Sequence, residues 1–104
     1  MIRITLACAG GYSTSLLINR IEEEAKKRKL EVTVQAIGEM TIAEHIGEFD
    51  VLLLGPQVHH VLSAVKKLVE GVAPVEMIDM RDYGTMNGAR VLDAAIRMYN
   101  DYYK

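Results

Sequence analysis

Four short apolar runs divide the chain, and the stretches between them carry apolar residues at helical spacing. The runs are Ile2–Ala7, Glu31–Ile37, Val51–Leu54 and Val75–Ile78. Three of them are almost continuously hydrophobic, which is typical of strands that are buried on both faces of a parallel sheet. We therefore predict four strands, three of them buried on both faces.

Amphipathic patterns predict three helices, at Ser13–Lys29, Gln57–Glu70 and Gly88–Tyr103. Each has an apolar stripe along one face, which in the last helix contains Val91, Ala95, Met98 and Tyr102. Gly71 follows the second helix as a C-terminal cap. In the first helix, the residues at 22–24 are Glu and those at 26–28 are basic. Since opposite charges four residues apart stabilise a solvated helix face, this acidic run is interpreted as surface rather than as a site.

The alternation of strands and helices predicts one α/β domain, with helices on both faces of a four-stranded parallel sheet. Residues 38–49 are expected to form a short helix or an irregular crossover. With strand order 2-1-3-4, the switch point lies between the first and third strands, where such folds bind ligands beyond the carboxyl ends. Cys8 follows the first strand and Gly55-Pro56-Gln57 follows the third, so both are expected to border one crevice.

Composition narrows the classes of function. The chain has 104 residues, a formal net charge of −2 and a single cysteine. This charge predicts neither a nucleic-acid partner nor an anionic membrane surface. No spacing typical of a metal site occurs and no cofactor is expected. One thiol cannot form an intrachain disulfide, which disfavours a redox role and suits a cytoplasmic protein.

The segment CAGGYSTS joins the first strand to the first helix. It has a purely structural interpretation, because Gly10 and Gly11 allow a tight turn, and Ser13 or Thr14 can cap the helix. A lone cysteine is also more often packing than chemistry. Its position favours chemistry, however. At a helix N-terminus, unpaired N–H groups and the helix dipole favour the thiolate, and a glycine-rich backbone there can cradle an anion.

Two chemistries use such a loop. Low-molecular-weight tyrosine phosphatases have a similar cysteine loop in the pattern C-x5-R-[ST], in which the arginine grips the phosphate. Here the sixth residue after Cys8 is Thr14, and the loop contains no arginine. This weakens the alternative of a phosphatase-like hydrolase that uses Cys8. It suits a phosphoryl carrier, because a carrier must hold phosphocysteine without accelerating its hydrolysis.

Four stretches together resemble the IIB component of bacterial sugar phosphotransferase systems, lactose/cellobiose (chitobiose) type. They are C-x-x-G-x-S-T-S-L-L from Cys8, LLLGPQV at 52–58, PVEMID at 74–79, and Tyr83-Gly84 followed by Gly88-x-x-Val-Leu. The resemblance spans essentially the whole chain and so implies one such domain at 1–104, with the fold of low-molecular-weight tyrosine phosphatases. One departure is Ala9-Gly10, where family members often have Ser-Ala.

The resemblance implies a phosphoryl relay. A IIB protein accepts a phosphoryl group from phosphohistidine on its IIA partner, holds it as phosphocysteine, and passes it to a sugar bound by the membrane transporter IIC. By position, Cys8 is then the nucleophile, and the phosphate-binding residues are Ala9, Gly10, Gly11, Tyr12, Ser13, Thr14 and Ser15. The resemblance also implies a cytoplasmic protein that associates peripherally with the transporter. We expect a monomer and a β-linked disaccharide such as cellobiose, chitobiose or lactose.

Other polar residues near the predicted crevice receive structural interpretations. His59 and His60 are read as exposed helical residues, and Asp79 and Asp82 as turn formers after the fourth strand. For Gln57, a capping role and a position beside the cysteine loop remain open. Tyr12 is expected to place a partly exposed ring next to the cysteine. The tyrosines near the C-terminus, Tyr99, Tyr102 and Tyr103, are expected to pack partly against the domain.

Overall fold

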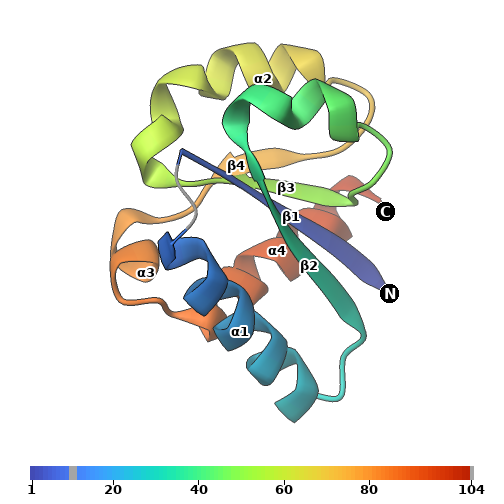
Figure 1. The fold of residues 1–104 in the computed structure, drawn as a ribbon. Helices are drawn as coiled ribbons and strands as arrows, with labels where there is room; N and C mark the ends of the chain where they lie inside the picture. Colours follow the sequence, from blue (N-terminus) through green and yellow to red (C-terminus); the bar gives the residue numbers. More distant parts are fainter. Residues whose placement is uncertain (10–11, 104) are drawn as a thin grey trace.

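The four predicted strands form one parallel sheet in the predicted order. The computed structural model describes residues 1–9 and 12–103, and for residues 12 and 13 the main chain only. The strands are β1 (Ile2–Cys8), β2 (Val32–Gly38), β3 (Val51–Leu54) and β4 (Val75–Met77). They lie in the order β2-β1-β3-β4, and every neighbouring pair is parallel (Figure 1). The predicted architecture and switch point are therefore confirmed.

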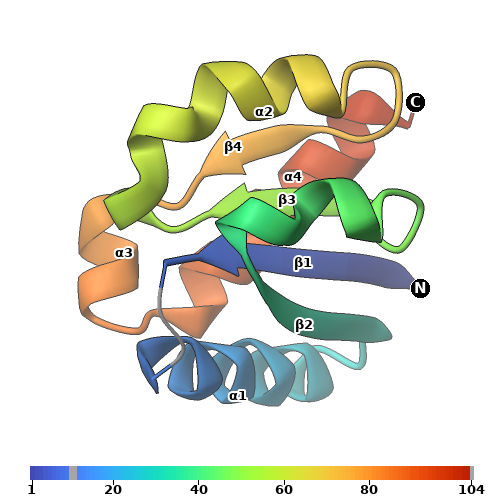
Figure 2. The same cartoon turned by 45° about the horizontal axis from the view of Figure 1, so that its top comes forward.

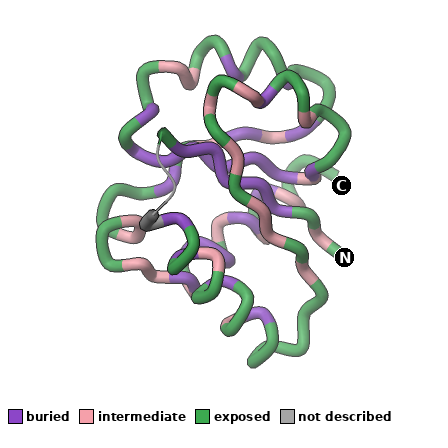
Figure 3. The backbone as a smooth tube through the Cα atoms, viewed as in Figure 1, coloured by how far each residue is buried: buried purple, intermediate pink, exposed green. Residues whose placement is uncertain are grey.

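Helices cover both faces of this sheet (Figure 2). On one face lie α1 (Tyr12–Lys27) and α4 (Gly88–Tyr102), and on the other lie the 3-10 helices η1 (Glu39–His45) and η2 (Pro56–Val61) with α2 (Leu62–Leu68). The short helix α3 (Met80–Gly84) follows β4. Parallel strands need covered faces because both sides carry apolar side chains, and Figure 3 shows the central strands as the most buried part of the chain.

Alternation along β1 assigns its side chains to two separate cores. Ile4, Leu6 and Cys8 belong to the core between the sheet and α1 and α4, whereas Ala7 belongs to the core beneath η1 and α2. This follows from the two-residue period of a strand, in which successive side chains point to opposite faces. The face of the sheet on which the cysteine lies is thus fixed by the strand itself.

Four expectations about the helices need correction. The predicted helix Gln57–Glu70 is divided into η2 and α2, since Pro56 opens the segment and Val58 has non-helical φ and ψ. The helix α3 lies where only a turn was expected. The first helix begins at Tyr12, so Ser13 and Thr14 lie within its first turn and not at its N-cap. Gly71 has a left-handed φ of 77°, but it does not cap α2, because α2 ends at Leu68 and its C-cap is Val69.

The surface charges of α1 also tie it to α4. Of the predicted pairs four residues apart, Glu24 and Arg28 form a salt bridge at 2.9 Å. Lys27 instead approaches Glu24, three residues before it, at 3.8 Å. Arg28 then reaches Asp93 of α4 at 2.6 Å. The acidic run is therefore part of a solvated helix face, as its spacing indicated.

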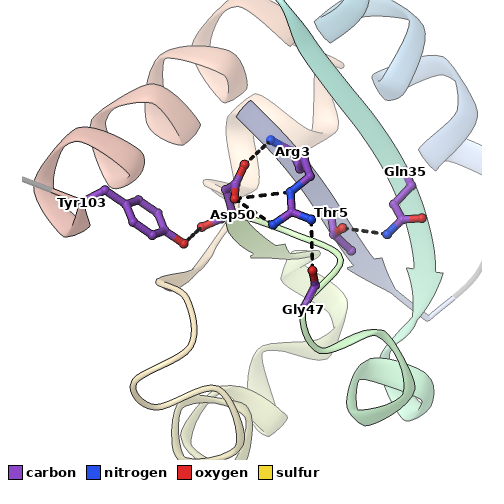
Figure 4. Close-up of polar contacts among 6 residues, drawn as sticks. All are labelled: Arg3, Thr5, Gln35, Gly47, Asp50 and Tyr103. Atoms are coloured by element: carbon purple, nitrogen blue, oxygen red, sulfur yellow. Dashed lines mark hydrogen bonds and ion pairs between the residues drawn. The ribbon is translucent and has the colours of Figure 1, made fainter. Parts of the chain in front are cut away.

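A polar cluster joins the ends of three elements at the amino-terminal edge of the sheet (Figure 4). Asp50, just before β3, accepts hydrogen bonds from the main-chain N–H of Arg3 at 2.8 Å and from the Arg3 guanidinium at 3.0 Å. Tyr103 donates its hydroxyl to the carbonyl of Asp50 at 2.8 Å. The rings of Tyr99 and Tyr102 both lie 4.8 Å from that of Tyr103. Tyr99 is half-buried, while Tyr102 and Tyr103 are exposed, so the partial packing predicted for these tyrosines is confirmed.

Candidate functional site

Cys8 is the last residue of β1 and lies beside the N-terminus of α1. Its side chain is 4% exposed, on the face of the sheet that α1 and α4 cover. Since α1 begins at Tyr12, only residues 9–11 separate the sulfur-bearing residue from the helix start. The main-chain N–H groups of the first helical turn have no acceptors within the helix. The arrangement thus places the N-terminus of α1, with the positive end of its dipole, next to the strand end that carries the thiol.

The structure describes the side chains of only some of the predicted phosphate-binding residues. Gly10 and Gly11 lie outside the described residues, as do the side chains of Tyr12 and Ser13, so the expected position of the Tyr12 ring stays a prediction. Ala9 and Ser15 are exposed. Thr14 is 1% exposed. It occupies the position at which the phosphatase pattern has its arginine, and a buried threonine there cannot supply a guanidinium.

Gly55 brings the end of β3 against the sulfur. Its N–H donates to the carbonyl of Ala7 at 2.9 Å, which continues the pairing of β1 with β3 by one residue. A Cβ at Gly55 would lie 3.0 Å from Cys8 Sγ and 2.5 Å from Gln57 Oε1. The predicted neighbourhood of Cys8 and Gly55-Pro56-Gln57 is therefore confirmed, and Gln57 lies beside the cysteine. It does not cap η2, whose N-cap Gly55 has no side-chain hydrogen bond.

Tyr83 joins this group from α3. Its hydroxyl accepts a hydrogen bond from Gln57 Nε2 at 3.2 Å, and its ring packs against the core that contains Cys8. The sequence assigned Tyr83 no role beyond its part in the resemblance, because the helix that positions it was not predicted. The motif Tyr83-Gly84 was the one available signal.

The other polar residues have structural roles. Asp79 accepts hydrogen bonds from the N–H groups of Arg81 and Asp82, at 2.9 and 3.1 Å, and so caps α3. Asp82 forms a salt bridge with Arg90 at 3.0 Å. The turn-forming interpretation of these aspartates is close to what the structure shows, with a short helix in place of a simple turn.

His59 and His60 are exposed, as expected. His59 Nδ1 lies 3.0 Å from the carbonyl oxygen of Pro56, and its ring lies edge-to-face against that of His60 at 6.0 Å. Within residues 1–9 and 12–103, no three potential metal ligands come together. Nor does any helix in the described part of the chain have the length and apolar character needed to cross a membrane.

Comparison with known proteins assigns the family. Residues 3–94 match the family described as "PTS system, Lactose/Cellobiose specific IIB subunit". The chain is 40% identical to the galactose-specific EIIB component of Lactococcus lactis subsp. cremoris (strain MG1363) and to the cellobiose-specific EIIB component of L. lactis subsp. lactis (strain IL1403). Both alignments cover 93% of this chain and 95% of the relative. The oligo-beta-mannoside-specific EIIB component of Bacillus subtilis (strain 168) is 33% identical, over 94% of this chain and 96% of the relative.

Solved structures agree with this assignment. The solution structure of the cellobiose-specific phosphotransferase IIB component from Borrelia burgdorferi superposes with a TM-score of 0.80 at 40% identity, covering 96% of this chain and 93% of that one. The lactose-specific IIB domain from Streptococcus pneumoniae has the same fold, with a TM-score of 0.81 at 22% identity, covering 94% of this chain and 97% of that one. By sequence and by fold, the chain belongs to the lactose/cellobiose-specific IIB family of the sugar phosphotransferase system.

Proposed function

We propose that Cys8 carries the phosphoryl group in a sugar phosphotransferase system. In this proposal a IIA protein donates the group from a phosphohistidine, and the phosphocysteine passes it to a sugar held by the transporter IIC. The supporting observation is the position of Cys8, which ends β1 close to the N-terminus of α1, the positive end of the helix dipole. Membership of the IIB family independently favours this role.

The chemistry of the transfer needs little covalent assistance from the protein. The thiolate sulfur attacks phosphorus, an S–P bond forms as the P–N bond breaks, and the bonding pair stays on the histidine nitrogen of IIA. The thiol proton has already left to solvent before the attack. Phosphoryl transfer depends mainly on in-line positioning and charge neutralisation. The main-chain N–H groups of residues 9–15, the proposed cradle, supply that neutralisation without a metal or a general base.

The burial of Cys8 sets one condition on the relay. With 4% of the residue exposed, the sulfur reaches the incoming phosphorus only after the surrounding side chains make room. We propose that docking of IIA supplies this rearrangement, so that phosphocysteine forms in the complex and not by free encounter with small phosphate donors.

A hydrolase is the weaker alternative. The position of the phosphatase arginine holds the buried Thr14, so no guanidinium from that position stabilises water attack on phosphocysteine. We expect no turnover of a chromogenic phosphate monoester above that of Cys8→Ser. A Cys8-dependent turnover would favour the hydrolase.

The family supports proposals for the class of sugar and for the location of the protein. The relatives are named for galactose, cellobiose and oligo-beta-mannosides, and we propose a β-linked disaccharide for this chain. The sugar is bound by IIC in this proposal. We propose further that the IIB chain works as a monomer at the cytoplasmic side of the membrane, with IIA and IIC as successive partners.

Mass spectrometry tests the proposed function. Incubation with a phosphorylated IIA protein of the same type should add about 80 Da, one phosphoryl group, to the peptide that contains Cys8. Cys8→Ser should remain unmodified, because a serine hydroxyl is not ionised at neutral pH. Phosphate on another residue, or none on the wild type, would overturn the assignment.

A further inference from the structure

Two segments that the proposed function leaves without a role meet at Gln57, beside the cysteine. Gly55-Pro56-Gln57 follows β3, and Tyr83 lies in α3, so they are far apart in the sequence. In the structure, Gln57 lies between the cysteine and the tyrosine. Its Oε1 lies on the side of Gly55 and Cys8, whereas its Nε2 donates to Tyr83 at 3.2 Å.

The distances place the amide next to the reacting atom. A single point, the Cβ position at Gly55, is 3.0 Å from Cys8 Sγ and 2.5 Å from Gln57 Oε1. Sulfur and oxygen are therefore at most about 5.5 Å apart. An S–P–O unit spans about half of this distance, so an oxygen of a phosphoryl group that points towards Gln57 would lie within hydrogen-bond reach of its amide.

The observed amide orientation fits an unmodified thiol. A carbonyl oxygen is only an acceptor, and a thiol is a weak donor. The same orientation opposes a phosphoryl group, because the anionic oxygens would then face another acceptor. If the amide turns over, Nε2 donates its N–H to the anion in a charge-assisted hydrogen bond. Next to a phosphorylated cysteine, the turned orientation is therefore the more stable one.

We propose that the amide of Gln57 turns over when Cys8 is phosphorylated and that Nε2 then binds a phosphoryl oxygen. Tyr83 permits this exchange, because a hydroxyl both accepts and donates. It accepts from Nε2 in the unmodified chain and donates to Oε1 in the phosphorylated chain, so the bond between the two side chains is kept in both states. Gln57 is thus a binding residue for the phosphoryl group, and Tyr83 is its positioning residue. This inference rests on the proposed phosphocysteine.

Substitutions at these positions separate charge, hydrogen bonding and packing. Gln57→Glu keeps the shape but adds a negative charge that cannot donate, and we expect phosphoryl transfer from IIA to slow at least tenfold. Asn100→Asp adds the same charge on the exposed far part of α4 and should leave the rate within twofold. Tyr83→Phe keeps the ring and removes the hydroxyl, and we expect about a fivefold loss, as for one hydrogen bond.

A double substitution tests whether Tyr83 acts through Gln57. In a Gln57→Leu background, Tyr83→Phe should change the transfer rate no further, because the amide that it positions is gone. A general packing role of the tyrosine would instead lower the rate equally in both backgrounds. Phosphorylation should also shift the side-chain amide resonances of Gln57 in ¹H–¹⁵N spectra of the wild type, and shift them less in Tyr83→Phe.

The outcomes distinguish this inference from the proposed function. Wild-type protein that gains phosphate on Cys8, while the Gln57 and Tyr83 variants react at the wild-type rate and the Gln57 resonances stay fixed, would refute the amide exchange alone. Wild-type protein that gains no phosphate on Cys8 from the IIA donor would refute both. Slowed variants with additive effects in the double substitution would refute the positioning role of Tyr83.

Discussion

Gly88 of α4 and Arg20 of α1 meet without space for a side chain between them. A Cβ at Gly88 would lie 2.4 Å from the carbonyl carbon and 2.5 Å from the carbonyl oxygen of Arg20. Since these are main-chain atoms, they cannot move aside without displacing the helix. We expect Gly88→Ala to lower the free energy of unfolding by about 2–4 kcal/mol, through overpacking of the two helices.

Urea denaturation of Gly88→Ala beside Gly84→Ala checks this expectation. No atom lies within 4 Å of a Cβ at Gly84, and its φ is not positive. That control should therefore change stability by less than about 1 kcal/mol, with a small gain from helix propensity. Equal midpoints for the two variants would show that the helices separate without cost.

The contact of Gly55 with the sulfur predicts a loss of transfer without a large loss of stability. In Gly55→Ala, the new methyl would crowd Cys8 Sγ at 3.0 Å and push away the tip of Gln57. The glutamine tip is flexible, so we expect destabilisation of about 1 kcal/mol. Transfer from IIA should slow at least tenfold. Gly38→Ala, at the same edge of the sheet with nothing within 4 Å, should transfer normally, and an equal loss there would contradict this explanation.

The ion pair of Asp50 predicts an acid-dependent contribution to stability. Partial burial tends to raise the pKa of Asp50, but the hydrogen bonds and charge of Arg3 outweigh it, and the net pKa is lowered. A carboxyl with a lowered folded pKa stabilises the fold above its unfolded value, near 3.9, and this stabilisation disappears as the pH falls through the folded pKa. At neutral pH, Asp50→Asn should cost about 1–2 kcal/mol.

Denaturation midpoints measured between neutral and strongly acidic pH check this dependence. The difference between Asp50→Asn and the wild type should shrink below about pH 4 as the wild-type carboxyl is protonated. Glu70→Gln serves as the control, because Glu70 is exposed in the turn after α2. Its denaturation midpoint should differ little from that of the wild type at any pH. A difference for Asp50→Asn that stays constant with pH would mean that the charge of Asp50 is irrelevant.

The hydroxyl of Tyr103 predicts an alkaline effect of the opposite sign. Burial, and then the charge of Asp50, raise the pKa of Tyr103. The neutral phenol is therefore favoured in the fold, and its stabilisation is complete below the unfolded pKa of about 10 and is lost as the pH rises through the folded value. Tyr103→Phe should cost about 0.5–1 kcal/mol at neutral pH through its hydrogen bond to Asp50.

Hydrogen exchange of the last turn of α4 measures this attachment locally. In Tyr103→Phe we expect faster exchange of those amides at neutral pH, and above about pH 10 a smaller difference from the wild type. Tyr102→Phe is the matched control, because the exposed residue Tyr102 has no hydrogen bond from its hydroxyl within the described part of the chain. Exchange that is unchanged in both would leave the hydrogen bond without a measurable role.

The strands have strong local sequence patterns and were predictable. The helix α3 and the division of the predicted helix Gln57–Glu70 have weak ones and were not predicted. The apolar runs predicted all four strands, most strongly β1 and β3, which are mostly buried. The order 2-1-3-4 does not follow from these runs; it is a common arrangement of doubly wound sheets. The five residues Met80–Gly84 carry no full helical period, and it is the cap by Asp79 that holds them in a helix. Likewise, Gln57–Glu70 has helical spacing throughout, and the kink at Val58 follows from the local backbone after Pro56.

The site was predictable in part for the same reason. The neighbourhood of Cys8 and Gly55 follows from strand order alone, since parallel strands bring their carboxyl ends to one edge. The bond between Gln57 and Tyr83 does not, because it depends on how an unpredicted helix packs over that edge. The role of Gln57 accordingly required the structure.

Cys8 lies on the same face of the sheet as Ile4 and Leu6. The chemistry therefore depends on the number of residues in β1 before Cys8, because a change by one residue moves the side chain to the other face. Deleting one residue within β1 would keep the strand apolar. The sulfur would then point to the opposite face of the sheet, which η1 and α2 cover, and away from the N-terminus of α1. Insertions in this strand are therefore tolerable for function only in pairs, whereas the loops at the opposite edge are free of this constraint.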